Sequence, residues 1–173
     1  MKKVLLINGS PNEKGCTALA LEEIASTLKK RGIESDIKQI GKKPVAGCIA
    51  CYSCARTGRC AFNDSVNEMI ESLDSYGALV VGSPVYYGSA TGQICCLLDR
   101  LFFAGGRLMD GKVGACVVSC RRGGASAAFD RLNKYFLMNN MPLASSQYWN
   151  QVHGNTPDEV RQDAEGLQTM RTL

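Results

Sequence analysis

Three short, uninterrupted apolar runs constrain the fold of this 173-residue chain more than any other feature. They are VLLI at residues 4–7, ALVV at the start of ALVVGSP (residues 78–84), and VGACVVS at residues 113–119. A strand with one face in water alternates apolar and polar side chains, whereas a parallel strand covered by helices on both faces is apolar throughout. Each run therefore predicts a buried strand of a parallel sheet.

Helical patterns alternate with these strands along the chain. Residues 17–31 carry apolar side chains at helical spacing and stop before Gly32, a residue that suits the end of a helix. We expect further helices at 63–73 (capped by Asn63 or Asp64), 90–103, 125–139 and from Pro157, and further strands at 35–40 and near 143–146. The alternation predicts an α/β fold, a doubly wound parallel sheet with helices on both faces.

The length and composition exclude several classes of protein. At roughly 150 residues per domain, residues 1–173 make one domain. No apolar run approaches the ~18 residues of a membrane span, and MKKVLLINGSP is too short for an export signal, so we expect a cytoplasmic protein. The net charge of +4 comes from scattered Lys and Arg pairs, which argues against nucleic-acid binding.

In a doubly wound sheet the ligand crevice lies beyond the carboxyl ends of the strands. The loop after the first strand, NGSPNEKGCT, offers Ser10, Asn12 and Thr17 beside the amides that open the next helix, and such a turn can bind a phosphate. The sequence is neither GxGxxG nor GxxxxGK[ST], which disfavours a dinucleotide fingerprint and a Walker-type loop. An ordinary capped turn uses the same residue types, so both interpretations stay open.

The loops after the other two strands point to a flat aromatic ligand. GSPVYYG places Pro84, Val85, Tyr86 and Tyr87 at the end of a strand, where a planar ligand would cover them. SCRRGGAS adds two arginines and two glycines that allow a close backbone approach. Taken singly, tyrosines at the edge of a core and a solvated RRGG turn would also explain these two loops. Together the three loops suggest a crevice with a phosphate end and a planar end, the shape of flavin mononucleotide (FMN).

The segment GCIACYSCARTGRC, residues 47–60, holds Cys48, Cys51, Cys54 and Cys60 at the spacing CxxCxxCx5C. Four thiolates can bind a [4Fe-4S] cluster, although the spacing differs from that of bacterial ferredoxins. Zinc more often uses two CxxC pairs a dozen or more residues apart. A redox disulfide or a packed loop without metal would also explain the segment, and nine cysteines in a chain expected in the cytoplasm argue against a disulfide scaffold.

In the order of these motifs the chain resembles the flavodoxin-like NAD(P)H-dependent FMN reductases, in the branch related to iron-sulfur flavoproteins. The resemblance rests on GSPNEKGCT, the cysteine segment, GSPVYYGSATGQICCLLDR, SCRRGGAS and SSQYWNQVHG. It implies a five-stranded flavodoxin-like sheet and a homodimer or higher homo-oligomer with flavin sites at or near the interface. It also implies hydride transfer from NAD(P)H through bound FMN to flavin, quinone or another small acceptor. The compact cysteine spacing is similar to that of iron-sulfur flavoproteins, while other flavin reductases keep GCxxCxxC without a cluster.

The resemblance also implies the FMN-binding residues. The chemistry takes place at flavin N5, so no side chain is predicted to be catalytic. Arg121 or Arg122 is expected to stabilise the charge of reduced flavin or to select the 2′-phosphate of NADPH, and His153 to be structural or exposed. The predicted FMN-binding residues are Ser10, Asn12, Cys16, Thr17, Ala18, Pro84, Val85, Tyr86, Tyr87, Gly88, Ser119, Arg121, Arg122, Gly123 and Gly124.

Three features depart from the family pattern. Cys16 stands where a small polar residue is common, and QICC at residues 93–96 replaces a lysine-containing helix start, a change expected to alter acceptor contacts. The chain also stops at QTMRTL inside a helical pattern, which suggests a truncated C-terminal helix. Three functions follow from the sequence: an FMN-dependent oxidoreductase, an electron carrier with FMN and a [4Fe-4S] cluster, and a non-catalytic thiol or metal sensor.

Overall fold

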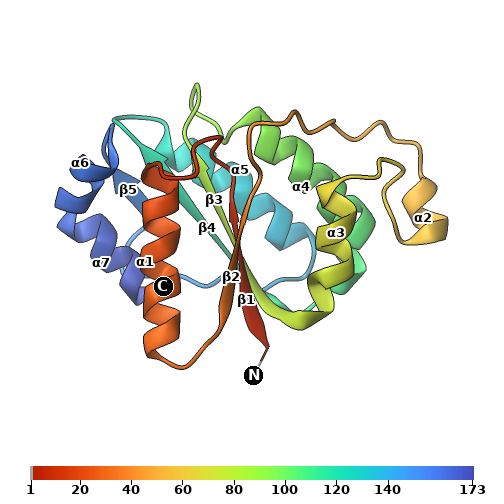
Figure 1. The fold of residues 1–173 in the computed structure, drawn as a ribbon, viewed down its shortest axis with the longest axis horizontal. Helices are drawn as coiled ribbons and strands as arrows, with labels where there is room; N and C mark the ends of the chain where they lie inside the picture. Colours follow the sequence, from red (N-terminus) through yellow and green to blue (C-terminus); the bar gives the residue numbers. More distant parts are fainter. Residues whose placement is uncertain (1) are drawn as a thin grey trace.

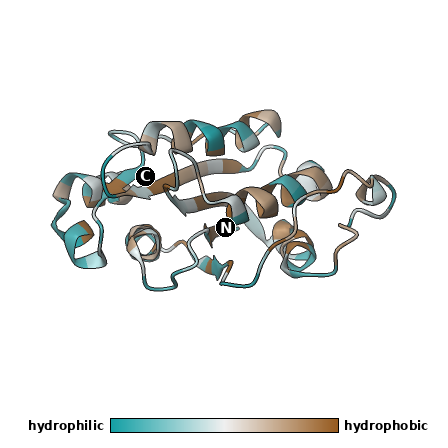
Figure 2. Cartoon of the chain, turned by 90° about the horizontal axis from the view of Figure 1, so that it is seen from above, coloured by the Kyte–Doolittle hydropathy of each residue, from teal (hydrophilic) through white to brown (hydrophobic). Residues whose placement is uncertain are grey.

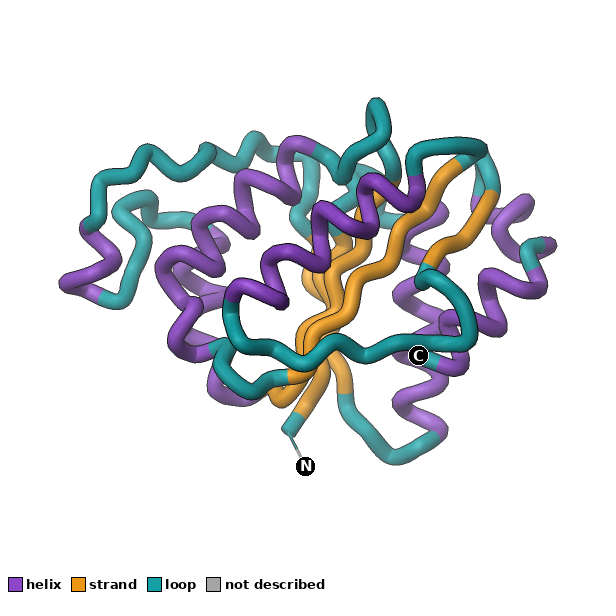
Figure 3. The backbone as a smooth tube through the Cα atoms, turned by 180° about the vertical axis from the view of Figure 1, so that it is seen from behind, coloured by secondary structure: helices purple, strands orange, loops and turns teal. Residues whose placement is uncertain are grey.

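The computed structural model describes residues 2–173 and contains a five-stranded parallel sheet in the order β2-β1-β3-β4-β5 (Figures 1 and 3). This is the flavodoxin-like order, so the predicted fold class is confirmed. The strands are β1 (Lys3–Asn8), β2 (Ser35–Gln39), β3 (Tyr76–Pro84), β4 (Val113–Cys120) and β5 (Gln151–His153). The three apolar runs form β1, β3 and β4, which are the three central strands.

Helices cover both faces of the sheet (Figure 2). One layer packs α1, α6 and α7 on the sheet, and the other packs α3, α4 and α5. The helices are α1 (Cys16–Lys30), α2 (Ser53–Thr57), α3 (Ser65–Ser72), α4 (Gly92–Gly105), α5 (Ala125–Met138), α6 (Pro157–Gln162) and α7 (Ala164–Thr172), with 3-10 turns η1 (Leu73–Ser75) and η2 (Gly106–Leu108). None of the helices in residues 2–173 is both long and apolar enough to cross a bilayer.

The sheet divides the hydrophobic core into two clusters. Along β1, Leu5 and Ile7 face the layer of α3, α4 and α5, while Val4 and Leu6 face the layer of α1, α6 and α7. Because successive strand side chains point to opposite faces, a strand buried on both sides needs an apolar residue at every position. The uninterrupted runs in the sequence are explained by this double burial.

The prediction of a strand at residues 143–146 is wrong. Leu143 makes only an isolated bridge to Gly114 at the beginning of β4, and the chain then runs along the sheet before β5 pairs with the end of β4. Pro142 has no N–H, and the polar SSQ that follows gives no apolar strand face, so pairing stops there. The short helix α2, inside the cysteine segment, was not predicted.

The largest fully buried side chain is that of Arg100, in the middle of α4. Its two terminal nitrogens each donate to one oxygen of Asp64, both at 2.7 Å. Asp64 also caps α3, since Oδ1 accepts from the Val66 N–H at 3.1 Å. The Arg100 hydrogen bonds hold the pKa of Asp64 below its ordinary value of 3.8.

Backbones approach closely where β1 ends beside β3. The Gly9 N–H donates to the Gly82 carbonyl at 2.7 Å, and a Cβ on Gly9 would lie 2.6 Å from that oxygen and 2.8 Å from Ile94. We expect Gly9→Ala to lower the free energy of unfolding by roughly 1–3 kcal/mol, because the first crevice loop must shift. Gly92→Ala is the control, since its Cβ would meet no atom of the described residues within 4 Å apart from its own helix backbone. Equal urea midpoints for the two variants would contradict the close approach.

The ion pair predicts a specific pH dependence. A lowered folded-state pKa means that the Asp64 contribution is complete above about pH 3.8 and is lost as the pH falls through the folded-state value. Asp64→Asn keeps a good helix cap but loses the charge. We expect it to cost about 2 kcal/mol at pH 7, less than a fully buried pair because the Asp64 side chain is 36% exposed. The difference in free energy of unfolding between variant and wild type, measured with urea, should disappear below pH 3.8. A difference that stays constant with pH would contradict this prediction.

Candidate functional site

A crevice with a volume of about 890 Å³ opens at the carboxyl edge of the sheet. Its walls come from the loops that follow β1, β2, β3, β4 and β5, which gather at the upper edge in Figure 1. The volume lies within the range of about 300–1,000 Å³ that is usual for small-molecule sites. The crevice is therefore where a doubly wound fold is expected to bind its ligand.

The loop after β1 is shaped by short polar contacts. The Asn8 side chain accepts from the Ser10 N–H at 3.0 Å, and the Ser10 hydroxyl accepts from the Asn12 N–H at 3.1 Å. α1 begins after Gly15, which has no side chain to cap the helix. The 15-residue helix thus presents its first amides to the crevice without the side-chain cap that an ordinary capped turn requires. These amides are suited to bind a phosphate.

Thr17, in the first turn of α1, is held by the end of β4. Its hydroxyl lies 2.8 Å from the Ser119 hydroxyl, and both side chains are buried. The contact joins the first turn of α1 to the end of β4, 102 residues apart in the sequence. It fixes the spacing between the phosphate end of the crevice and the wall formed by β4.

The loops after β3 and β4 form the planar end. Val85 donates its backbone N–H to the Ser119 carbonyl at 2.9 Å, and a Cβ on Gly124 would lie 2.8 Å from Gly88. Only glycine suits position 124, because its φ of +89° adds to this close contact. Tyr86 is half-exposed on the crevice wall, and Tyr87 is fully exposed at the tip of the turn. An aromatic surface is thus available to a planar ligand.

Nine of the predicted FMN-binding residues line the crevice. They are Ser10, Asn12, Cys16, Thr17, Pro84, Val85, Tyr86, Ser119 and Arg121. The other six lie behind or beside its walls: Ala18 is buried in the first turn of α1, while Tyr87, Gly88, Arg122, Gly123 and Gly124 form the turns above the crevice. The structure brings all three predicted loops together.

Sequence reasoning missed part of the lining. Lys42 enters from the loop after β2, and Gly154, Asn155 and Pro157 enter from the segment after β5. The carboxyl-edge rule applies to these two strands as well, so it was the signal that could have found them. With Lys14 and Arg121, Lys42 adds positive charge to the lining, against the single carboxylate of Glu13. This charge balance suits an anionic ligand.

Two thiols at the crevice are neutral. Burial raises the pKa of Cys16, whose Sγ lies 3.7 Å from the Gly154 carbonyl. Burial, followed by the charge of Asp163, raises the pKa of Cys120. The Cys120 sulfur lies 3.4 Å from Nδ1 of His153, an exposed residue outside the crevice lining. Neither thiol is suited to act as a nucleophile.

The four cysteines of the 47–60 segment lie around one small pocket against α4. Its other lining residues include Phe62, Phe103 and Arg100. Ala50 and Tyr52 have positive φ values of 52° and 56°, an uncommon conformation for residues other than glycine, and they curve the backbone around Cys51. Among residues 2–173, however, no three Cys, His, Asp or Glu side chains converge closely enough to hold a metal.

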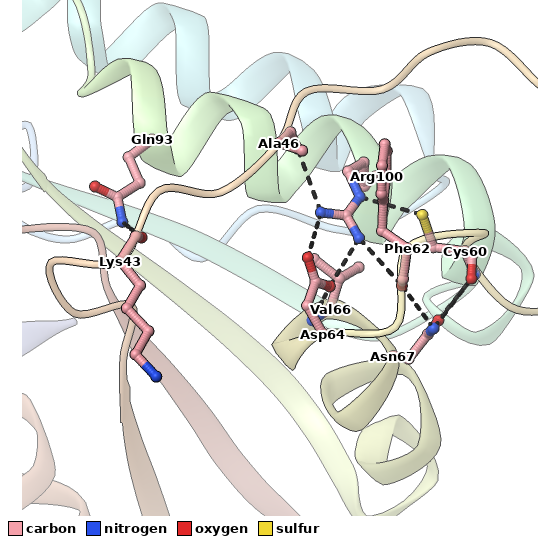
Figure 4. Close-up of polar contacts among 9 residues, drawn as sticks. All are labelled: Lys43, Ala46, Cys60, Phe62, Asp64, Val66, Asn67, Gln93 and Arg100. Carbon is pink, nitrogen blue, oxygen red and sulfur yellow. Dashed lines mark hydrogen bonds and ion pairs between the residues drawn. The ribbon is translucent and has the colours of Figure 1, made fainter.

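The thiol donors and their common pocket fit a [4Fe-4S] cluster in chemistry and placement, but the loop must close further to bring the sulfurs together. Cys48 and Cys51 are exposed, so their side chains are free to move. Cys60 is fixed already, because Nε of Arg100 donates to its sulfur at 3.1 Å (Figure 4). The metal prediction therefore stays open in the structure.

Comparison with known proteins agrees with this site. An iron-sulfur flavoprotein of Methanocaldococcus jannaschii is 30% identical over 99% of this chain and 93% of its own length. An iron-sulfur flavoprotein of Archaeoglobus fulgidus is 36% identical over 78% of this chain and 68% of its own. The Trp repressor binding protein of Bacillus subtilis shares the fold, with a TM-score of 0.73, 18% identity, and coverage of 99% of this chain and 100% of that one.

The family comparison covers most of the chain. Residues 2–156 match the family described as NADPH-dependent FMN reductase, a range that includes all three crevice loops and the cysteine segment. With the crevice geometry and the iron-sulfur flavoprotein relatives, this match confirms the resemblance found in the sequence. The chain belongs to the NADPH-dependent FMN reductase family.

Proposed function

We propose that this chain is an FMN-dependent oxidoreductase that takes a hydride from NAD(P)H and passes electrons to a small acceptor. The crevice carries the proposal, because it joins uncapped amides of α1 at one end to the Pro84–Tyr86 wall at the other. Family membership supports the FMN-dependent oxidoreductase. The choice of NAD(P)H as the electron donor and of a small molecule as the acceptor belongs to the proposal.

Different residues of the crevice would bind the phosphate and the ring of FMN. The amides that open α1, with the cations of Lys14 and Lys42, would hold the FMN phosphate. Val85 and Tyr86 would cover the ring and exclude water from one side. Bound FMN supplies hydride chemistry at N5, so the protein needs only to position the reactants and stabilise charge. Arg121, on the crevice lining, would stabilise negative charge on the reduced ring.

Phosphate recognition is testable by comparing FMN with riboflavin. We expect the wild-type protein to bind FMN more tightly, and Lys42→Ala to weaken FMN binding roughly threefold, the size expected for one exposed charge pair, while riboflavin binding is unchanged. Lys43→Ala is the matched control, because Lys43 is not in the crevice lining. In the part of the chain that the structure describes, its hydrogen bond is made by its carbonyl, with Gln93, and not by its side chain. Flavin fluorescence titrations measure all affinities. Equal wild-type affinities for FMN and riboflavin would overturn the phosphate site.

Donor choice is testable at the turn above the crevice. Arg122 is exposed there, next to Arg121 of the lining, where it can reach the 2′-phosphate of NADPH. We expect Arg122→Ala to raise the KM for NADPH about threefold more than that for NADH. Arg107→Ala, in η2 at the opposite edge of the sheet, should change neither. Steady-state oxidation of each nucleotide gives the comparison, and equal effects on both would remove the 2′-phosphate role.

A second candidate is an electron carrier in which the cysteine segment holds a [4Fe-4S] cluster. The common pocket of Cys48, Cys51, Cys54 and Cys60 favours it, as do relatives named iron-sulfur flavoproteins. A bound cluster would supply one-electron chemistry beside the two-electron chemistry of FMN. An anaerobic absorption spectrum with iron analysis separates the candidates: about four irons per chain indicates the carrier, and flavin bands without iron indicate the simple reductase. The homodimer or higher homo-oligomer stays a prediction.

A further inference from the structure

Cys60 differs from the other three cysteines because its backbone is anchored on both sides. The buried Asn67 side chain accepts from the Cys60 N–H at 2.8 Å and donates to the Cys60 carbonyl at 3.0 Å. The same amide donates to the Phe62 carbonyl at 2.9 Å. The backbone of the fourth cysteine is therefore fixed by α3 in the protein alone.

The sulfur of Cys60 is also fixed, by Arg100. Each of the five N–H groups of the guanidinium has an acceptor (Figure 4): two meet the carboxylate of Asp64, two meet the carbonyls of Ala46 and Phe62, and Nε–H meets the Cys60 sulfur. The side chain has no exposed surface, and its guanidinium lies 4.8 Å from the centroid of the Phe62 ring. Because all five N–H groups have acceptors, Arg100 has none left to donate to another group.

The contact to sulfur is not needed to neutralise Arg100. Asp64 already balances its charge through a bidentate pair. In the described residues, the side chains of Cys48, Cys51 and Cys54 make no hydrogen bond, so the donor is specific to Cys60. A buried N–H aimed at a thiolate acts as a local dipole that stabilises negative charge on the sulfur.

We propose that Arg100 is a positioning residue that presents Cys60 as the preformed ligand of the cluster and raises the cluster's reduction potential. This inference rests on the proposed electron-carrier function. Hydrogen bonds to ligand sulfurs are among the factors that set the potentials of iron-sulfur clusters. Reduction adds negative charge that the ligand sulfurs share, and the Nε–H bond becomes stronger as that charge grows. The reduced form is thereby favoured.

The test uses Arg100→Lys in the full chain, reconstituted anaerobically with iron and sulfide. Lysine keeps a positive charge for Asp64 but lacks the planar fork that reaches the carboxylate and the sulfur together. Gln93→Ala is the matched control. Gln93 lies on the same helix, and it holds the connector between β2 and the cysteine segment (residues 40–46) through the carbonyls of Gly41 and Lys43. Among the described residues it makes no hydrogen bond to a cysteine of that segment (Figure 4).

The main readouts are iron content and the potential of the iron signal in an electron paramagnetic resonance titration. We expect Arg100→Lys to lower the potential of the cluster or to lose iron, with FMN content unchanged, while Gln93→Ala retains the wild-type iron content and potential. Equal potentials in all three proteins would overturn the proposal. Equal shifts in both variants would also overturn it, because they would trace the effect to a loosened connector.

Two further measurements test the proposal if Arg100→Lys does not fold or if the wild-type protein takes up no iron. If Arg100→Lys fails to fold, the double variant Arg100→Gln with Asp64→Asn removes both charges of the pair together and is read in the same titration. If the wild-type protein takes up no iron, the proposed cluster fails, and positioning is then measured by mass spectrometry of alkylated cysteines. Cys60 should react more slowly than Cys48 in the wild type, and this difference should shrink in Arg100→Lys but not in Gln93→Ala. An unchanged difference would overturn the positioning role.

Discussion

Burial of the parallel sheet on both faces is the constraint on which the rest of this structure depends. The apolar side chains in the middle of β1, β3 and β4 contact the two helix layers, so these stretches leave no side chain free for chemistry. Polar side chains can gather only where the strands end. Asn8 and Ser119 show this change: each lies at or near the end of an otherwise apolar strand, is buried, and makes the contacts that shape the crevice.

Helix α4 connects the crevice with the cysteine segment. At its beginning, the Thr91 hydroxyl donates to the Gly9 carbonyl at 2.9 Å and accepts from the Ile94 N–H, so the helix cap is tied to the first crevice loop. Further along, Gln93 and Arg100 hold the connector that leads to the cysteines. Thr91 and Arg100 are about 14 Å apart along the helix axis, at 1.5 Å per residue. A change in the crevice loop and a change at Cys60 therefore act on the same rigid element.

The elements that depend on local sequence pattern were predicted correctly. The features that depend on contacts between residues far apart in the sequence were missed. Continuous apolar runs identified β1, β3 and β4, and their loops identified most of the crevice lining. The position of β5 was missed because it depends on where the chain finds free edge groups on β4, and a three-residue strand carries almost no pattern. The contact between Arg100 and Cys60 spans 40 residues, and nothing in LLDR shows that its arginine points into the protein.

Gln93 illustrates why a departure from a family pattern needs a structure to interpret. The sequence suggested that QICC at residues 93–96, in place of a lysine-containing helix start, alters contacts with the acceptor. In the structure the amide of Gln93 donates to the carbonyls of Gly41 and Lys43, at 3.2 and 2.6 Å, and thus holds the connector between β2 and the cysteine segment. A lysine can donate to carbonyls too, but it would add a charge close to Lys42 and Lys43. The uncharged amide of Gln93 makes these contacts without that repulsion, so it favours an ordered chain between β2 and the cysteine segment.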